Sequence, residues 1–386
     1  MTELPWRRLA LSILIVALSS LPVFLVGATF LQLEREIGLT TTGLGAVTAL
    51  FFLTAAITSA PLGRVIERIG WRTSFRVNSV FSALILVSIA LAARSVMSLS
   101  VLLVAGGAVY GLANPAANKA LAERVQPERR GLMFGLKHAG IPSSTLFAGL
   151  AVPTLALTVG WRFAFGFAAL LFPVIWFLLA SDSDSPIDFA EIESPSGGVK
   201  RMSIPQVAAL AGAAALATWA AVSLSTFLVA AAVDASLSEA GAGLLLFFGS
   251  LTTIGTRVVA GQITDRRRAR GFAGLAGLMG IGSLVFIALS GATGPWFVGL
   301  VLLAFATGWG WPGLMTYTVV NANIGTPAAS SAVTQTGIFL GAGVGPIVLG
   351  WLIDNVSRAA SWTTVAVSLF VASVITLGVA RATRVP

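Results

Sequence analysis

The chain has 386 residues, of which 56% are hydrophobic and only 10% are charged, and this composition excludes an ordinary soluble protein. Its net charge of +9 comes from arginines in short segments between apolar runs, which is typical of a membrane protein and argues against a nucleic-acid partner. With no cysteine and a single histidine, structural disulfides, thiol-bound metals and a histidine cluster are excluded, so we expect no cofactor and no metal site.

Apolar runs of about 20 residues, long enough to cross a hydrocarbon core of about 30 Å, recur along the whole chain. The first run is too long for the apolar region of a cleaved signal peptide, so we expect it to remain as a helix. In order, the predicted spans are 9–31, 43–63, 74–94, 98–119, 132–157, 162–180, 205–232, 242–262, 272–290, 295–318, 330–353 and 362–381. The sequence therefore predicts an all-α membrane protein with twelve transmembrane helices.

The connection between the sixth and seventh spans differs from the other, shorter connections. It is polar, acidic and rich in turn-forming residues, including Pro186, Pro195 and Gly197-Gly198, which is typical of a flexible linker. We therefore predict an N-terminal six-helix bundle at 1–181, a linker at 182–203 and a C-terminal six-helix bundle at 204–386.

Lysine and arginine are unevenly distributed between the two sides of the predicted membrane. Seventeen lie on the side of the N-terminus, and only Arg35, Arg94, Arg162 and Arg358 lie on the other. Because cytoplasmic loops carry the excess of positive charge, both termini and the linker are predicted to be cytoplasmic. The expected location is the bacterial cytoplasmic (inner) membrane.

A charged motif occurs twice, each time directly after an apolar run. Gly63, Glu67, Arg68 and Arg72 match Gly261, Asp265, Arg266 and Arg270 at a constant offset of 198 residues. The same offset pairs Glu36, Leu39 and Gly43 with Asp234, Leu237 and Gly241. Two matches at one offset indicate an internal duplication, and hence two pseudo-symmetric bundles of six helices each.

The motif resembles the Gly-x-x-x-Asp-Arg-x-Gly-Arg-Lys/Arg loop that members of the major facilitator superfamily carry between helices two and three and repeat between helices eight and nine. The twelve spans, the middle linker and the cytoplasmic termini fit the same fold, so the resemblance covers the whole chain. Two departures are Glu67 in place of aspartate and the absence of the inner glycine from the second copy.

In this family the motif implies a latch that closes the cytoplasmic side while the cavity opens outward. Gly63 lacks a side chain, so a helix of the other half can approach its backbone, and the carboxylate of Glu67 can accept from a helix N-terminus and pair with arginines. The predicted latch residues are Gly63, Glu67, Arg68, Arg72, Gly261, Asp265 and Arg266. The alternative is that these charges only set the membrane topology.

Arg257 is the sharpest candidate for binding a substrate. It lies eight residues before Asp265, or about 12 Å along a helix, and no acidic residue lies in any predicted span. A charge at that depth is costly and normally faces a wet cavity or a partner, which favours an anionic substrate. The alternative is an arginine that snorkels toward the cytoplasm and caps carbonyl groups. The spacing Arg257-x-x-x-Gly261-x-x-x-Asp265 is similar to that of monocarboxylate and oxalate-type carriers, whose arginine engages a carboxylate.

Lys137 and His138, about two turns into helix five, form the second candidate. Successive residues of a helix project about 100° apart, so at most one of the two points into a central cavity. Lys137 either attracts the anion or snorkels to the inner surface. His138 either carries a proton, as its ordinary pKa permits, or acts as a neutral hydrogen-bonding group. Gln335 on helix eleven aligns loosely with His138 and is predicted to lie opposite it.

Helices four and ten carry similar sequences that predict a matching pair of breaks, Asn114-Pro115 and Trp311-Pro312, because proline frees a carbonyl and bends a helix. Asn114 and Asn118 are four residues apart and share a face, so both are predicted to contact the substrate. Trp311 and Tyr317, with Trp309 and Trp219 as further candidates, offer flat apolar walls.

Together these features predict a secondary active transporter that moves a small organic anion, and more narrowly a monocarboxylate, by alternating access. Proton symport would offset the inside-negative potential, and anion exchange is equally compatible. The expected partners are this small-molecule substrate and membrane lipid, and the chain is expected to be monomeric.

Two other classes of function compete with this prediction. A proton-driven exporter of drugs or neutral metabolites lacks support, because no span holds an acid and helix five does not match the Gly-x-x-x-Gly-Pro-x-x-Gly-Gly pattern of facilitator antiporters. An enzyme is not expected, because no nucleophile-base-acid set, phosphate loop or metal spacing is present. A sensor is not expected either, because both tails are short.

Overall fold

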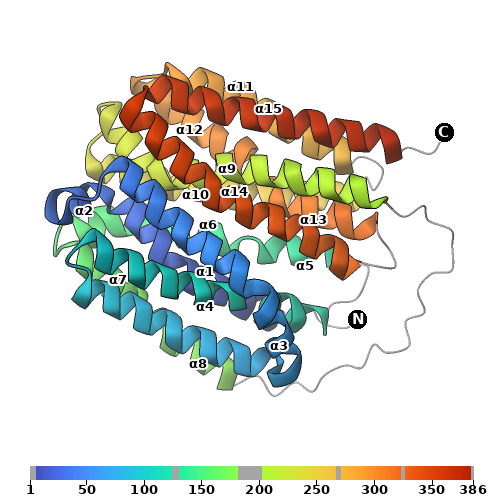
Figure 1. The fold of residues 1–386 in the computed structure, drawn as a ribbon, viewed down its shortest axis with the longest axis horizontal. Helices are drawn as coiled ribbons and strands as arrows, with labels where there is room; N and C mark the ends of the chain where they lie inside the picture. The colour runs from blue at the N-terminus through green and yellow to red at the C-terminus, as the bar shows by residue number, and fades with distance from the viewer. Residues whose placement is uncertain (1–5, 124–129, 181–201, 267–270, 323–326, 384–386) are drawn as a thin grey trace.

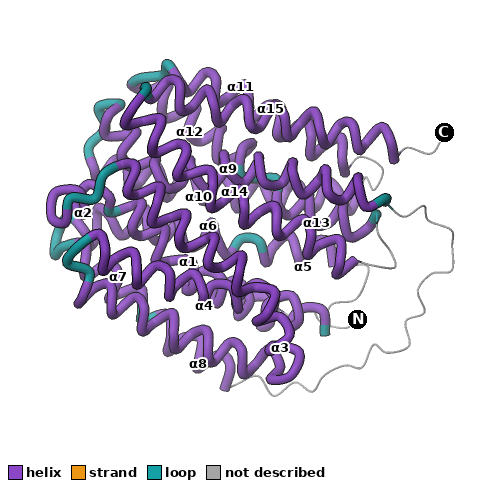
Figure 2. The backbone as a smooth tube through the Cα atoms, viewed as in Figure 1, coloured by secondary structure: helices purple, strands orange, loops and turns teal. Residues whose placement is uncertain are grey.

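The computed structural model describes residues 6–123, 130–180, 202–266, 271–322 and 327–383, and these residues are almost entirely helical (Figures 1 and 2). The helices are α1 (Trp6–Ala28), α2 (Phe30–Ile37), α3 (Thr41–Ala92), α4 (Val96–Ala122), α5 (Arg130–Lys137), α6 (Gly140–Ala151), α7 (Trp161–Ala168), α8 (Leu171–Ala180), α9 (Ile204–Asp234), α10 (Glu239–Arg266), α11 (Gly271–Ser290), α12 (Gly294–Gly308), α13 (Pro312–Asn321), α14 (Pro327–Asn355) and α15 (Arg358–Thr383). A π-helical segment, Val152–Ala156, follows α6.

The predicted spans fall on these helices. Within the described ranges, eleven helical segments are long and apolar enough to cross a membrane. One of them, Thr41–Ala92, holds both the second and the third predicted span, because the chain turns back at Gly70 (Figure 1). Gly70 has a φ of 76°, a left-handed conformation that glycine adopts without steric cost. The inner glycine of the first motif thus makes the turn between two antiparallel helices.

The bundle has two ends, which we name by the chain. The termini end is where α1 begins and α15 finishes, and the far end is where α2 lies (Figure 1). Following the predicted division of the chain, we call α1–α8 the N-terminal half and α9–α15 the C-terminal half. The halves pack against each other through α3 with α14, α6 with α10, α1 with α9, and α5 with α13. Most of the predicted linker, residues 182–201, lies outside the described residues.

The helix breaks differ from those that the sequence predicts. Helix ten breaks as predicted, between the end of α12 at Gly308 and the start of α13 at Pro312. The predicted matching break at Pro115 is wrong, because α4 continues through this residue. A proline removes only one backbone hydrogen bond, and here close packing on α3 supports the helix: a Cβ on Gly111 would lie 3.1 Å from the carbonyl oxygen of Ala55. Helix five breaks instead, between α5 and α6.

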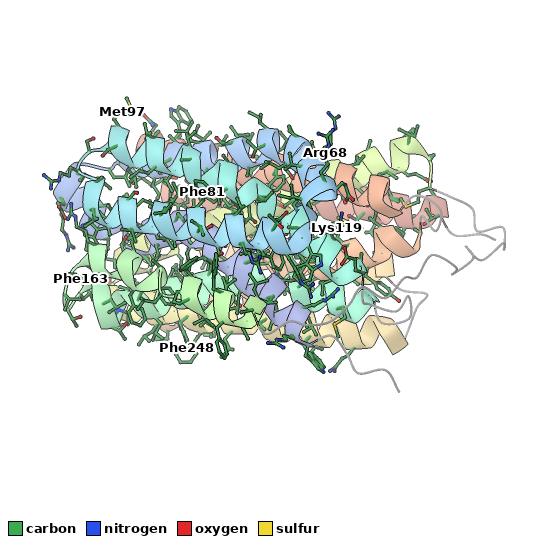
Figure 3. All side chains as sticks on the ribbon, turned by 90° about the horizontal axis from the view of Figure 1, so that it is seen from below. Arg68, Phe81, Met97, Lys119, Phe163 and Phe248 are labelled. Carbon is green, nitrogen blue, oxygen red and sulfur yellow. The ribbon has the colours of Figure 1, made fainter. Side chains whose placement is uncertain are left out.

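The outer surface of the bundle is apolar, as a hydrocarbon environment requires. Phe81, Met97, Phe163 and Phe248 each expose half or more of their area, and Figure 3 shows these four on the periphery. Arg68 also projects outward, toward the termini end, whereas Lys119 lies closer to the body of the bundle (Figure 3). Polar side chains are instead buried between helices, for example Ser144, Thr145 and Ser250.

Candidate functional site

Arg257 lies inside the bundle, on the part of α10 that is long and apolar enough to span a membrane. Only 5% of the residue is exposed. Its charge is therefore removed from water, which is costly unless hydrogen bonds or an opposite charge compensate. The hydrogen bonds of the guanidinium group show how this cost is met.

The guanidinium group bridges two helix breaks, one from each half. Its Nη1 donates to the carbonyl oxygen of His138, between α5 and α6, and its Nη2 donates to the carbonyl oxygen of Trp309 at 2.8 Å, between α12 and α13. The ring of Trp309 also lies 5.9 Å from the Cζ atom, within cation–π range. Arg257 thus ties the two halves together at the middle of the bundle.

Proline explains why the carbonyl group of His138 is free. In a continuous helix this oxygen would accept from the backbone N–H of the residue four positions later, which is Pro142, and proline has no N–H. The carbonyl group of Trp309 follows the last turn of α12, where carbonyl groups also lack partners within the helix. The capping role that the sequence offered as an alternative for Arg257 is therefore present in the structure.

Lys137 and His138 point to different surroundings, as the helical offset of about 100° between neighbours implies. The imidazole Nε2 of His138 lies 3.1 Å from the hydroxyl of Thr316 on α13, in the other half. The ammonium group of Lys137, which is 2% exposed, donates instead to the side-chain carbonyl of Asn118 at 2.8 Å. Lys137 therefore bonds within the N-terminal half, and His138 reaches across to the C-terminal half.

A small cavity lies between the halves beside Arg257. The cavity volume is about 40 Å³, which is enough for a few water molecules. Five predicted site residues line it: Asn114, His138, Arg257, Trp311 and Gln335. Three others do not, namely Lys137, Asn118 and Tyr317. Gln335 and His138 thus share one cavity across the two halves.

Several lining residues were not predicted. They include Tyr110, Phe24, Phe52, Phe339 and Thr218. Two of them carry a signal in the sequence: Tyr110 lies four residues before Asn114, and Phe339 four residues after Gln335, so each shares a helix face with a predicted residue. The amide Nδ2 of Asn114 lies 3.4 Å from the hydroxyl of Tyr110. Phe24 and Phe52 have no such signal in a chain with 23 phenylalanines.

Glu67 and Arg72, two predicted latch residues of the first motif, each have a contact within their own half. A Cβ on Gly63 would meet nothing within 4 Å. Glu67 pairs with Lys119 of α4 at 2.7 Å, Arg68 is exposed, and the Cζ of Arg72 lies 5.1 Å from the ring of Trp71. In the second motif Gly261 is half-buried, and the side chains of Asp265 and Arg266 lie outside the described residues.

The donor set of the cavity does not favour a metal ion. Within the described ranges, no three His, Cys, Asp or Glu side chains gather where they could hold one, and the residues lining the cavity include no carboxylate. The site therefore offers hydrogen-bond donors and one fixed cation beside apolar walls, which suits the binding of a small molecule.

A comparison with family models identifies the chain. The model of the Major Facilitator Superfamily matches residues 12–334, which reach from α1 into α14 and so include both halves. A comparison with curated proteins gave no match. The all-helical structure agrees with the family, and the predicted fold class is confirmed. The chain therefore belongs to the Major Facilitator Superfamily, whose members are integral membrane transporters of small molecules and not enzymes.

Proposed function

We propose that this transporter moves a small organic anion, a monocarboxylate, across the membrane by alternating access, with proton symport as the coupling. One observation carries the proposal: Arg257 is buried and lines a cavity between the two halves, and the lining of that cavity includes no carboxylate to neutralise it. A fixed cation in a membrane-embedded cavity marks a substrate site, and an anion is the mobile partner that fits it.

The bonds of Arg257 suggest how binding and movement are coupled. The oxygens of a substrate carboxylate would replace the carbonyl oxygens of His138 and Trp309 as acceptors, because charge-assisted bonds to guanidinium are stronger than bonds to neutral carbonyls. Replacing the His138 carbonyl would remove the tie between the halves at the middle of the bundle. Anion binding would then favour the rocking of one half against the other that alternating access requires.

The energetics of anion uptake support proton symport as the coupling. Bringing one negative charge into a cell with a potential of 100 mV costs about 2.3 kcal/mol, and a proton that accompanies it cancels this cost. The proton would be carried by His138, which lines the cavity, or by the substrate itself. Exchange of one anion for another remains the alternative form of coupling, and it predicts no proton flux.

Export of drugs or neutral metabolites is the second candidate. One observation favours it: the bonds from Arg257 to two backbone carbonyls would serve equally well if the arginine had only a structural role. The two candidates differ in the substrate that stabilises the protein and in whether Arg257 is needed for its binding.

Ligand-induced thermal stabilisation of the purified protein tests this difference, because a ligand that binds the native state raises its melting temperature. The panel contains carboxylates, inorganic anions, neutral solutes and cationic drugs. We expect carboxylates to stabilise the wild type and not Arg257→Gln. Arg381→Gln, at the exposed end of α15, is the control and should behave as the wild type. Stabilisation by neutral or cationic solutes that persists in Arg257→Gln would overturn the proposal.

A further inference from the structure

The wall of the cavity is largely aromatic. Six of its lining residues are phenylalanine, tyrosine or tryptophan: Phe24, Phe52 and Tyr110 from the N-terminal half, and Trp309, Trp311 and Phe339 from the C-terminal half. A wall shared by both halves encloses whatever binds between them. Because burying apolar and aromatic surface supplies most of the affinity of such a pocket, the body of the substrate must be apolar.

Five of these rings form a continuous chain that crosses from one half to the other. The centroid of Phe24 lies 6.2 Å from that of Trp309 and 6.2 Å from that of Phe52. The chain continues from Phe52 to Tyr110 at 6.0 Å and from Tyr110 to Phe339 at 6.2 Å. Three of the four pairs are edge-to-face, the geometry in which aromatic rings attract one another. A flat aromatic ring that enters between them can adopt the same geometry.

The charge of the wall limits the substrate to one negative group. Arg257 is the lining residue with a permanent charge, since the ammonium of the neighbouring Lys137 is turned to Asn118. A second carboxylate on the substrate would face aromatic rings without a cation, and an unpaired buried charge is costly. Beside Arg257, the indole Nε1 of Trp311 is buried with no hydrogen-bond partner among the described residues, so it can donate to an acceptor on the ligand.

We infer that the substrate is an aromatic monocarboxylate, with its carboxylate on Arg257 and its ring within the chain of aromatic side chains that starts at Trp309. This inference rests on the proposed function and narrows it. The cavity volume of about 40 Å³ is too small for such a ligand. The side chains that line the cavity must therefore move apart to admit the ring and then close around it. That requirement is consistent with a cavity formed by two halves that move relative to each other.

Isothermal titration calorimetry with five probes tests the inference: benzoate, cyclohexanecarboxylate, acetate, terephthalate and benzamide. We expect benzoate to bind at least tenfold more tightly than acetate, because acetate has no ring. Cyclohexanecarboxylate has a similar size but no aromatic face, and we expect it to bind about two- to tenfold more weakly than benzoate. Terephthalate adds a second charge and benzamide removes the only one, so both should bind at least tenfold more weakly than benzoate.

Variants test the placement of the ring. Phe52→Leu and Phe339→Leu, one from each half, should each weaken benzoate binding about two- to tenfold and leave acetate binding unchanged. Phe81→Leu, on the exposed outer surface, is the control and should leave both unchanged. Using two variants keeps the test valid if one of them does not fold, which the melting temperature without ligand reveals.

The outcomes separate the two levels of the proposal. If acetate or terephthalate binds as tightly as benzoate, the aromatic monocarboxylate is wrong while an anion transporter remains. If neither ring variant changes benzoate binding, the placement of the ring is wrong. If benzamide binds and no carboxylate does, in the wild type and in Arg257→Gln alike, the proposed function itself is overturned.

Discussion

The two ends of the bundle hold the halves together in different ways. Toward the far end, α6 and α10 pack so closely that a Cβ on Gly149 would lie 2.6 Å from the carbonyl oxygen of Gly243. Thr42 of α3 also donates to Asp354 of α14, from its backbone N–H at 2.8 Å and from its hydroxyl at 2.6 Å. At the termini end, Glu67 of the repeated motif bonds within its own half. The far end is therefore closed by contacts between the halves.

The halves also meet nearer the termini end, where a Cβ on Gly313 of α13 would lie 3.2 Å from the Cα of Gly135 of α5, so the difference concerns the predicted latch and not the whole end. The far end is sealed by backbone contact, by the hydrogen bonds of Thr42 to Asp354 and by the ion pair of Glu239 with Arg35 of the other half. Of the motif that the sequence predicts to lock the opposite end, Glu67 pairs within its own half, and the side chains of Asp265 and Arg266 lie outside the described residues. With the predicted orientation, the sealed end faces outward. If the two ends close in alternation, a change that weakens one closure shifts the population toward the state in which that end is open.

A covalent link across the far end should have the largest effect. The chain has no cysteine, so the double variant Thr42→Cys with Asp354→Cys carries the only two thiols, at positions whose side chains are in contact. Linking them with a short bis-methanethiosulfonate reagent, which forms a disulfide bond with each thiol, should lower transport at least tenfold, because the far end could no longer open, and reduction of these disulfides should restore transport. The measurement is uptake into proteoliposomes of the carboxylate that the binding panel identifies.

A matched link within one half controls for this result. Glu36 and Arg162 lie at the same end, both in the N-terminal half, and their side chains pair at 2.5 Å. Linking Glu36→Cys to Arg162→Cys should leave transport within about twofold of the unlinked protein. Transport that survives the link between Thr42→Cys and Asp354→Cys would show that the far end does not need to open.

Filling the close contact between α6 and α10 should favour opening of the far end. Leucine in place of Gly149 would collide with the backbone of Gly243 and Phe247, and overpacking of this kind costs about 1–3 kcal/mol, or about 5- to 150-fold in the equilibrium. The buried side chain of Thr145, bonded to Ser250 across the halves at 2.7 Å, provides the reporter. The thiol of Thr145→Cys should react faster by a corresponding factor.

The control for this variant is Gly166→Leu. Gly166 lies in α7, and a Cβ there would meet nothing within 4 Å, so the reactivity of the reporter thiol should not change. Equal reactivity in the Gly149 and Gly166 variants would contradict the view that backbone contact seals the far end.

Removing one charge from the far-end seal should have a smaller effect in the same direction. Glu239 accepts from Gln32 at 2.9 Å and from Arg35, but the side chain of Arg35 is 63% exposed, and exposed ion pairs contribute at most about 1 kcal/mol. Glu239→Gln should raise the reactivity of the reporter thiol by up to about fivefold. Asp234→Asn breaks the ion pair with Arg358 inside the C-terminal half and should leave the reactivity of the reporter thiol unchanged.

A substitution in the repeated motif should change the reactivity of the reporter thiol in the opposite direction. If Glu67 helps to close the termini end in the other state, Glu67→Gln disfavours that state and should lower the reactivity of the reporter thiol, by about two- to fivefold. Lys119→Gln removes the same ion pair without removing the carboxylate. A latch predicts that only the Glu67 variant changes the rate, and equal changes in both variants would reduce the motif to a contact within one half.

The sequence predicts the elements more completely than it predicts their contacts. Long apolar runs and the cost of charge in hydrocarbon are properties of local sequence, and they place the spans and point to Arg257 and His138. The carbonyl partners of Arg257 depend on a helix break four residues before Pro142 and on how α10 packs against α5 and α12. That information is three-dimensional, so the sequence offers capping only as a general alternative.

The aromatic wall illustrates the same limit. Phenylalanine in an apolar helix faces lipid, another helix or a cavity with equal ease, so composition does not separate Phe52 from Phe81. The contacts of a charged residue are equally hard to predict. The ammonium group of Lys137 donates to Asn118 and does not line the cavity. Helical periodicity predicts that Lys137 and His138 diverge, but it does not predict which of them faces the other half.

Substitution of Glu36 should have the smallest effect, and it should change the stability of the N-terminal half without changing the opening of the far end. The indole N–H of Trp161 donates to Glu36 at 2.6 Å, and this bond, reinforced by Arg162, lowers the pKa of Glu36 below its ordinary value of 4.5. A lowered pKa in the folded state means that the stabilisation is complete above about pH 4.5 and is lost as the pH falls through the lowered pKa. The wild type should therefore melt at a slightly higher temperature than Glu36→Gln at neutral pH, and the difference should vanish in acid.

Because Glu36, Trp161 and Arg162 all belong to the N-terminal half, the reporter thiol at Thr145→Cys should react at the same rate with or without Glu36→Gln. A changed rate would mean that this pair, too, controls the opening of the far end.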